Sequence, residues 1–234
     1  MNKKLLLLSS SRVGDTAYLE HAKSMISEHL DTVDEVVFIP YAGVSVNYDD
    51  YTTMVADALA DINVKVVGIH SFADPVAAIN NAKAILVGGG NTFHLLHQLY
   101  ENNLITAIQN KVNQGTPYIG WSAGSNIAGM SIRTTNDMPI IQPQSFDALN
   151  LVPVQLNPHY TDFNPPGHNG ETREQRLTEF MVLNPETHIV GIVEGTALKL
   201  KDNKLGLVGP DVGYVFLNRN KQVISTDTDL SYLL

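Results

Sequence analysis

The stretch that decides the fold reads Pro117-Tyr118-Ile119-Gly120-Trp121-Ser122-Ala123-Gly124. An apolar run leads directly into a Gly-x-Ser-x-Gly motif, which is typical of a strand that turns sharply into a helix. The glycines allow a strained backbone and let a substrate approach closely. The motif predicts a strand at 118–121 and makes Ser122 a candidate nucleophile. The alternative interpretation is a glycine-rich turn without chemistry.

Apolar runs on both sides of this motif alternate with segments of helical periodicity. The clearest helical segment has apolar residues at positions 51, 54, 55, 58, 59 and 62, and another follows Asn91-Thr92. This alternation predicts an α/β fold in which helices cover both faces of a mostly parallel sheet. Functional sites in such sheets form at the carboxyl ends of the strands. The expected strands are Leu5–Leu8, Val36–Ile39, Val64–Val67, Ile85–Val87 and Tyr118–Trp121.

The second half of the chain has a different pattern. Residues 131–172 are rich in Pro, Asn, Asp and Gly, which predicts loops interrupted by a short strand near Val152–Leu156. A helix is expected from about Thr172 to Leu183. Short apolar runs separated by turns then predict antiparallel hairpins. Because no linker or repeat stands out, we expect a single domain over residues 1–234 with a small antiparallel C-terminal extension.

Composition limits the classes of function. The formal net charge of −9 argues against a nucleic-acid partner, and no apolar run approaches the roughly 20 residues of a membrane span. The absence of cysteine excludes disulfides and thiolate chemistry and fits a reducing compartment, so we expect a cytoplasmic protein. We expect no cofactor and no metal, and a monomer or homodimer. An acidic ligand would need a local Arg or Lys, because the protein as a whole repels anions.

A serine nucleophile needs a base near neutral pKa, and histidine is the usual choice. Of eight histidines, His159 is the strongest candidate, because it begins an irregular loop directly after a short predicted strand. His168, in a Pro-Pro-Gly-His segment, is the alternative. His94 and His97 are spaced as a metal pair on a helix, but no third ligand is evident.

A carboxylate must then orient the base. Glu194 follows the predicted strand His188–Val193, which places it at the same kind of strand end. Asp137 and Asp147 are alternatives, although Asp in loops more often serves as a turn or cap residue.

Two further features point to substrate contacts. The amides of Gly90 and Ala123 are natural donors to an oxyanion, because each lies beside a strand end. The triple glycine at 88–90 also fits a phosphate cradle, but it lacks the remaining residues of the dinucleotide and Walker motifs. Arg173 begins a predicted helix on the face of Leu177 and Phe180, which suggests an anion site. The alternative for Arg173 is an ion pair within its own helix.

The chain resembles the peptidase E (α-aspartyl dipeptidase) family. The resemblance covers the first strand to about Glu194-Gly195 and is loose beyond residue 195. It rests on these segments: 38–43 (FIPYAG), 87–93 (VGGGNTF), 119–124 (IGWSAG), 133–139 (RTTNDMP), 157–159 (NPH), 166–168 (PGH) and 170–176 (GETREQR).

This resemblance implies a serine hydrolase on a class I glutamine amidotransferase-like (flavodoxin-like) fold that cleaves small acidic dipeptides beginning with aspartate. It implies Ser122 as nucleophile, His159 as base and Glu194 as orienting acid. Asp137 stays the alternative acid, because Ser122–Asp137–His159 would follow the order of α/β-hydrolases.

The resemblance further implies an oxyanion hole made by Gly90 and Ala123, and Arg173 as the receptor of the aspartyl carboxylate. Two alternatives remain: a cyanophycinase-like β-aspartyl peptidase, and a non-catalytic protein that binds small acids. A loop over residues 160–170 would restrict the enzyme to dipeptides if it roofed the pocket.

Overall fold

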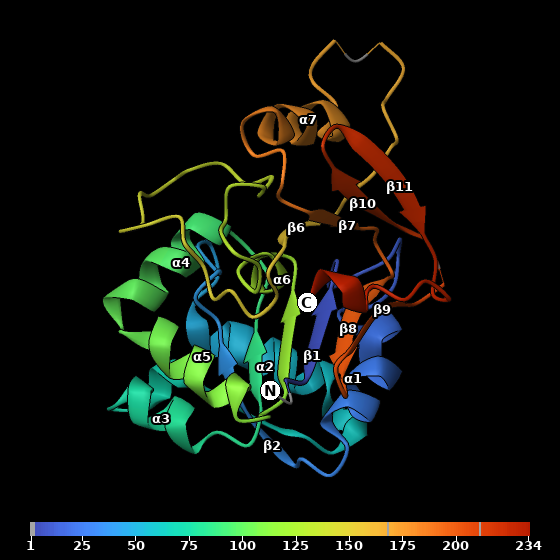
Figure 1. The fold of residues 1–234 in the computed structure, drawn as a ribbon. Helices are drawn as coiled ribbons and strands as arrows, with labels where there is room; N and C mark the ends of the chain where they lie inside the picture. Colours follow the sequence, from blue (N-terminus) through green and yellow to red (C-terminus); the bar gives the residue numbers. More distant parts are fainter. Residues whose placement is uncertain (1–2, 168, 211) are drawn as a thin grey trace.

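The computed structural model describes residues 3–167, 169–210 and 212–234 and contains a large sheet with a smaller second sheet beyond one end of its strands (Figure 1). The large sheet has seven strands in the order β3-β2-β4-β5-β1-β8-β9. Its first five strands are parallel, as predicted. The hairpin β8–β9 continues the sheet antiparallel to β1. The strands are β1 (Leu5–Leu8), β2 (Glu35–Ile39), β3 (Lys65–Gly68), β4 (Ile85–Val87), β5 (Tyr118–Trp121), β8 (Ala197–Lys201) and β9 (Lys204–Val208).

Helices cover both faces of this sheet, because its central strands are apolar on both sides. Leu5 and Leu7 of β1 pack with α3, α4 and α5, whereas Leu6 and Leu8 pack with α1 and α2. Among the described residues, no helix is long and apolar enough to cross a membrane. The helices are α1 (Lys23–Leu30), α2 (Tyr48–Ala58), α3 (Pro75–Asn81), α4 (Thr92–Glu101), α5 (Leu104–Asn113), α6 (Ala123–Asn126) and α7 (Arg173–Leu183), with 3-10 turns η1 (Glu20–Ala22), η2 (Ala60–Ile62), η3 (Ile69–Ser71) and η4 (Ser231–Leu233).

The second sheet has four strands in the order β11-β10-β7-β6 and lies above the carboxyl ends of the parallel strands, with α7 packed on it (Figure 1). β6 and β7 are parallel, whereas β10 is antiparallel to both of its neighbours. A small apolar cluster, which includes Tyr160, Leu177 and Phe216, joins α7 to this sheet. Its strands are β6 (Gln155–Pro158), β7 (Ile189–Ile192), β10 (Gly213–Leu217) and β11 (Asn220–Ile224).

Several elements differ from the sequence predictions in extent. The helix expected over 51–62 begins at Tyr48, because the side chain of Asn47 caps its first turn, and η2 replaces its last turn. The strand expected near Val152–Leu156 begins only at Gln155, after a proline that cannot donate to a ladder. The C-terminal hairpins are divided between the two sheets. β11 was not predicted, because its residues are mostly polar and exposed.

Candidate active site

Ser122 stands in a sharp turn between β5 and α6, at the carboxyl end of the large sheet. Its backbone has φ 53° and ψ −114°, a conformation that L-residues rarely adopt and that the surrounding structure must hold. The turn is tight, since a Cβ atom at Gly120 would lie 2.3 Å from the carbonyl oxygen of Gly124. Ser122 lines two cavities, and His159 lines both of them as well.

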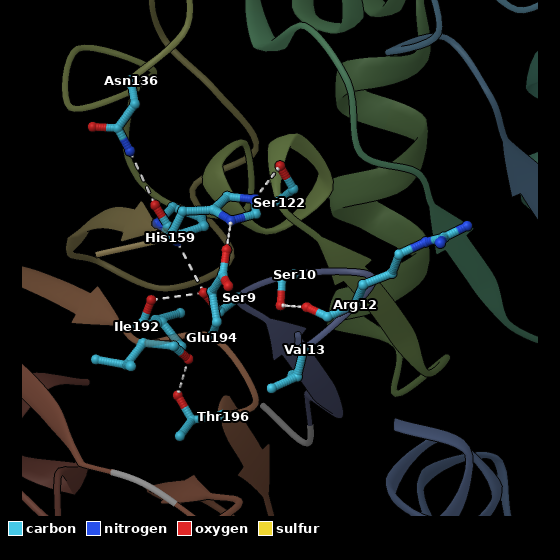
Figure 2. A network of polar contacts seen from close by, with 12 residues as sticks. Ser9, Ser10, Arg12, Val13, Ser122, Asn136, His159, Ile192, Glu194 and Thr196 are labelled. Carbon is cyan, nitrogen blue, oxygen red and sulfur yellow. Dashed lines mark hydrogen bonds and ion pairs between the residues drawn. The ribbon is translucent and has the colours of Figure 1, made fainter. Parts of the chain in front are cut away.

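His159 connects Ser122 to Glu194 (Figure 2). Its Nε2 atom lies 3.0 Å from Ser122 Oγ, and its Nδ1 atom lies 2.8 Å from Glu194 Oε1. With the proton on Nδ1, the imidazole donates to the carboxylate and accepts from the serine hydroxyl, which is the arrangement of a nucleophile, a base and an orienting acid. The side chains of His159 and Glu194 are 36% and 52% exposed, so the site is open to water.

The pairing of β6 with β7 explains why two residues so distant in sequence meet. These strands are parallel, and Pro158 lies opposite Ile192. His159 follows the first strand and Glu194 closely follows the second, so both emerge at the same edge of the second sheet. The turn that carries Ser122 ends β5 of the large sheet, so the candidate site lies where the two sheets meet.

Ser9 links these two sheets and supports the candidate site, although no motif in the sequence marks it. Its hydroxyl accepts a hydrogen bond from the backbone N–H of His159 (2.9 Å) and donates one to the carbonyl of Ile192 (2.7 Å) (Figure 2). Ser9 is completely buried and directly follows β1, the strand beside β5. Its place at a strand end was the one available signal. The contact holds His159 at φ 56°, another uncommon conformation.

Ala123 and Gly90, the expected oxyanion donors, line the smaller and the larger cavity beside Ser122, respectively. Ala123 begins α6, so its N–H has no partner within the helix. The carbonyl of Gly89 accepts a hydrogen bond from Tyr51 Oη (2.9 Å). Since the C=O and N–H of a trans peptide point in opposite directions, this bond turns the N–H of Gly90 away from Tyr51. Burial raises the pKa of Tyr51, which keeps the hydroxyl protonated as a donor.

Arg173 lies in the first turn of α7 and lines the smaller cavity, of about 210 Å³, together with Ser122, Asp137 and His159. Thr172 and Gln175 form a capping box that fixes this end of the helix. Within the residues that the structure describes, no carboxylate forms an ion pair with Arg173, so the expected alternative of an intrahelical pair is not observed. Burial lowers the pKa of the guanidinium, which nevertheless remains a cation at neutral pH.

Asp137, the alternative acid, does not contact His159. Its Oδ2 atom accepts hydrogen bonds from the backbone N–H and the hydroxyl of Thr92, at 2.7 and 2.6 Å, which stabilises the N-terminus of α4. Asp137 nevertheless lines the same cavity as Arg173 and contributes a carboxylate to that cavity. Asp147 lies in an isolated bridge to Ser131. His168, the alternative base, lies outside the described residues.

Lys221 of β11 ties the loop after His159 to α7. Its Nζ atom forms ion pairs with Asp162 and Glu174, and its charge lies over the ring of Tyr214. The described part of the loop expected to roof the pocket, over 160–170, does not line either cavity beside Ser122. The ion pair with Asp162 instead holds the first residues of this loop against the second sheet.

Comparisons with known proteins agree with this fold. A model of "Peptidase family S51" matches residues 5–208. The chain is 56% identical to "Peptidase E" of Shewanella amazonensis (strain ATCC BAA-1098 / SB2B) and 55% identical to "Peptidase E" of Shewanella sp. (strain W3-18-1), with both chains covered completely in each case. The crystal structure of a peptidase from an acI-B1 Actinobacterium superposes with a TM-score of 0.70 at 18% identity, covering 98% of this chain and 97% of the other. This last similarity concerns the fold alone.

Proposed function

The chain belongs to peptidase family S51, and from this premise we propose that it is a serine-type dipeptidase that hydrolyses dipeptides with an N-terminal aspartate. The proposal depends on one observation: Arg173 lines the cavity beside Ser122 and His159, and it has no ion-pair partner among the described residues. An acidic protein with a net charge of −9 needs such a local cation to hold an acidic side chain. The cysteine-free composition supports a cytoplasmic location.

In the proposed reaction, Ser122 Oγ attacks the carbonyl carbon of the aspartyl residue while its proton moves to His159 Nε2. Glu194 stabilises the resulting imidazolium through Nδ1–H. The N–H groups of Gly90 and Ala123 stabilise the oxyanion of the tetrahedral intermediate. The C–N bond then breaks, and His159 gives its proton to the leaving amine.

Water completes the cycle by hydrolysing the aspartyl ester. His159 takes a proton from the water as it attacks, and returns that proton to Ser122 Oγ when the ester bond breaks. Aspartate leaves with its side chain released from Arg173. Asp137 lines the same cavity, and we propose that its carboxylate binds the positively charged ammonium group of the substrate's N-terminal residue.

The test is hydrolysis of Asp-Leu beside Asn-Leu, Glu-Leu and β-Asp-Leu, with the Ser122→Ala variant and a remote control, Ser225→Ala. The parent and the control should cleave Asp-Leu much faster than the other three peptides. Ser122→Ala should lose essentially all turnover, and the parent should accumulate an aspartyl-enzyme that rapid-quench mass spectrometry detects. Turnover retained by Ser122→Ala would disprove the nucleophile, and faster cleavage of β-Asp-Leu would favour the cyanophycinase-like activity.

A further inference from the structure

A second and larger cavity, of about 510 Å³, also adjoins Ser122. Ser122 and His159 line both cavities, but the second one lacks Arg173 and Asp137. Its walls are mostly apolar, and three of its side chains, Val44, Met54 and Ile140, are exposed large hydrophobic groups. Exposed apolar surface within a concave site is typical of a surface that a ligand covers.

The reaction geometry assigns this cavity to one part of the substrate. The scissile carbonyl must lie at Ser122, and the aspartyl side chain lies toward Arg173 under the proposed function. The residue that leaves as an amine therefore extends away from Arg173, into the second cavity that adjoins Ser122. The assignment of this cavity to the second residue of the substrate rests on the proposed function.

Arg12 supplies a positive charge beside this cavity. Its guanidinium lies 5.9 Å from the ring centre of Tyr18, which itself lines the cavity. Arg12 is exposed, and no carboxylate in the described part of the chain forms an ion pair with it. In Figure 2 its side chain extends away from the His159–Glu194 pair.

The backbone that carries Arg12 is held in place. Ser10 Oγ donates to the carbonyl of Arg12 (2.7 Å), and the N–H of Leu19 donates to the carbonyl of Ser11 (2.7 Å). The ring of Tyr18 is fixed as well, because its hydroxyl accepts a hydrogen bond from Trp121 Nε1 (2.9 Å). A guanidinium on a fixed ring is a receptor that loses little entropy when it binds a carboxylate.

We propose that Arg12 binds the C-terminal carboxylate of the dipeptide, while the apolar cavity holds the uncharged side chain of its second residue. A dipeptide carries its only terminal carboxylate at this position, whereas a tripeptide has a neutral amide there. Arg12 therefore selects dipeptides by charge, and no roof over the site is needed for this selection.

The test compares Asp-Leu with its C-terminal amide, Asp-Leu-NH₂, in the parent, in Arg12→Gln and in Arg219→Gln. Arg219 is an exposed arginine in the turn between β10 and β11 and controls for the loss of one surface charge. Arg12→Gln should lower kcat/KM for Asp-Leu about tenfold, mainly through KM, and leave the amide within about twofold of the parent. Arg219→Gln should leave both substrates unchanged.

If Arg12 has only a structural role, Arg12→Gln should lower kcat/KM equally for both substrates. If Arg12 has no role, the substitution should change neither value. Either result overturns the proposal. A parent that cleaves Asp-Leu no better than the amide also overturns it, while leaving the proposed function intact. A parent that cleaves neither substrate rejects both proposals. As a second measurement, the parent should prefer Asp-Leu to Asp-Lys, since the cavity offers an apolar wall and Arg12 repels a cationic side chain.

Discussion

Replacing Arg173 with methionine tests the proposed recognition of aspartate most directly. Methionine keeps the apolar stem of the side chain and removes the charge. Arg173 has no carboxylate partner among the described residues, so the substitution breaks no ion pair within the protein. The interaction that is lost is the one with the substrate. We expect a large loss of activity toward Asp-Leu and little change toward Asn-Leu.

The magnitude follows from the contacts that a guanidinium makes with a carboxylate. Hydrogen bonds to charged groups contribute about 1.5–3 kcal/mol each, and a bidentate pair makes two of them. The total of about 3–6 kcal/mol corresponds to a decrease of roughly 10²–10⁴ in kcat/KM. Arg173 is only half-buried, so water screens part of this interaction and we expect the lower half of the range.

The assay measures kcat/KM for Asp-Leu and Asn-Leu in the parent, in Arg173→Met and in Arg176→Met. Arg176 lies on the same helix, is 57% exposed and pairs at 3.5 Å with Glu171, so it controls for the loss of one positive charge from α7. Arg173→Met should abolish the preference for Asp over Asn, whereas Arg176→Met should keep it. An Arg173→Met enzyme that hydrolyses Asp-Leu as well as the parent would refute the reasoning, as would an equal loss on both peptides.

Two further predictions concern the acids and a buried histidine. Glu194→Gln should lower kcat by at least about 10²-fold, which is less than the roughly 10⁴ of a buried triad acid because Glu194 is 52% exposed. Asp137→Asn should instead act mainly on KM. Steady-state kinetics of both variants test this, and the reverse pattern would exchange the two roles. Burial lowers the pKa of His29 from 6.5 to about 4, so the unfolded chain binds the proton more readily. The free energy of unfolding should therefore fall by roughly 3 kcal/mol as the pH drops from 6.5 to 4. Urea titrations across this range should show a smaller decrease for His29→Gln, and an equal decrease would contradict the assignment.

The five parallel strands of the large sheet could be predicted because their signals are local. Each central strand is a short apolar run buried on both faces, and Asn91 caps its helix as its sequence position indicates. The second sheet was not predicted as a separate unit, since its strands are short and β11 is polar. Strand pairing between such segments leaves little trace in hydrophobic periodicity.

The sequence by itself determined the parallel α/β core and the turn that carries Ser122, because five consecutive residues specify that turn. Only the tertiary structure decided which carboxylate contacts His159. Glu194 at a strand end and Asp137 in a loop were both candidates from the sequence. The register of β6 with β7 brings Glu194 to the imidazole, whereas Asp137 binds Thr92. That register depends on backbone hydrogen bonds between distant segments and on the buried Ser9, and no local pattern encodes either.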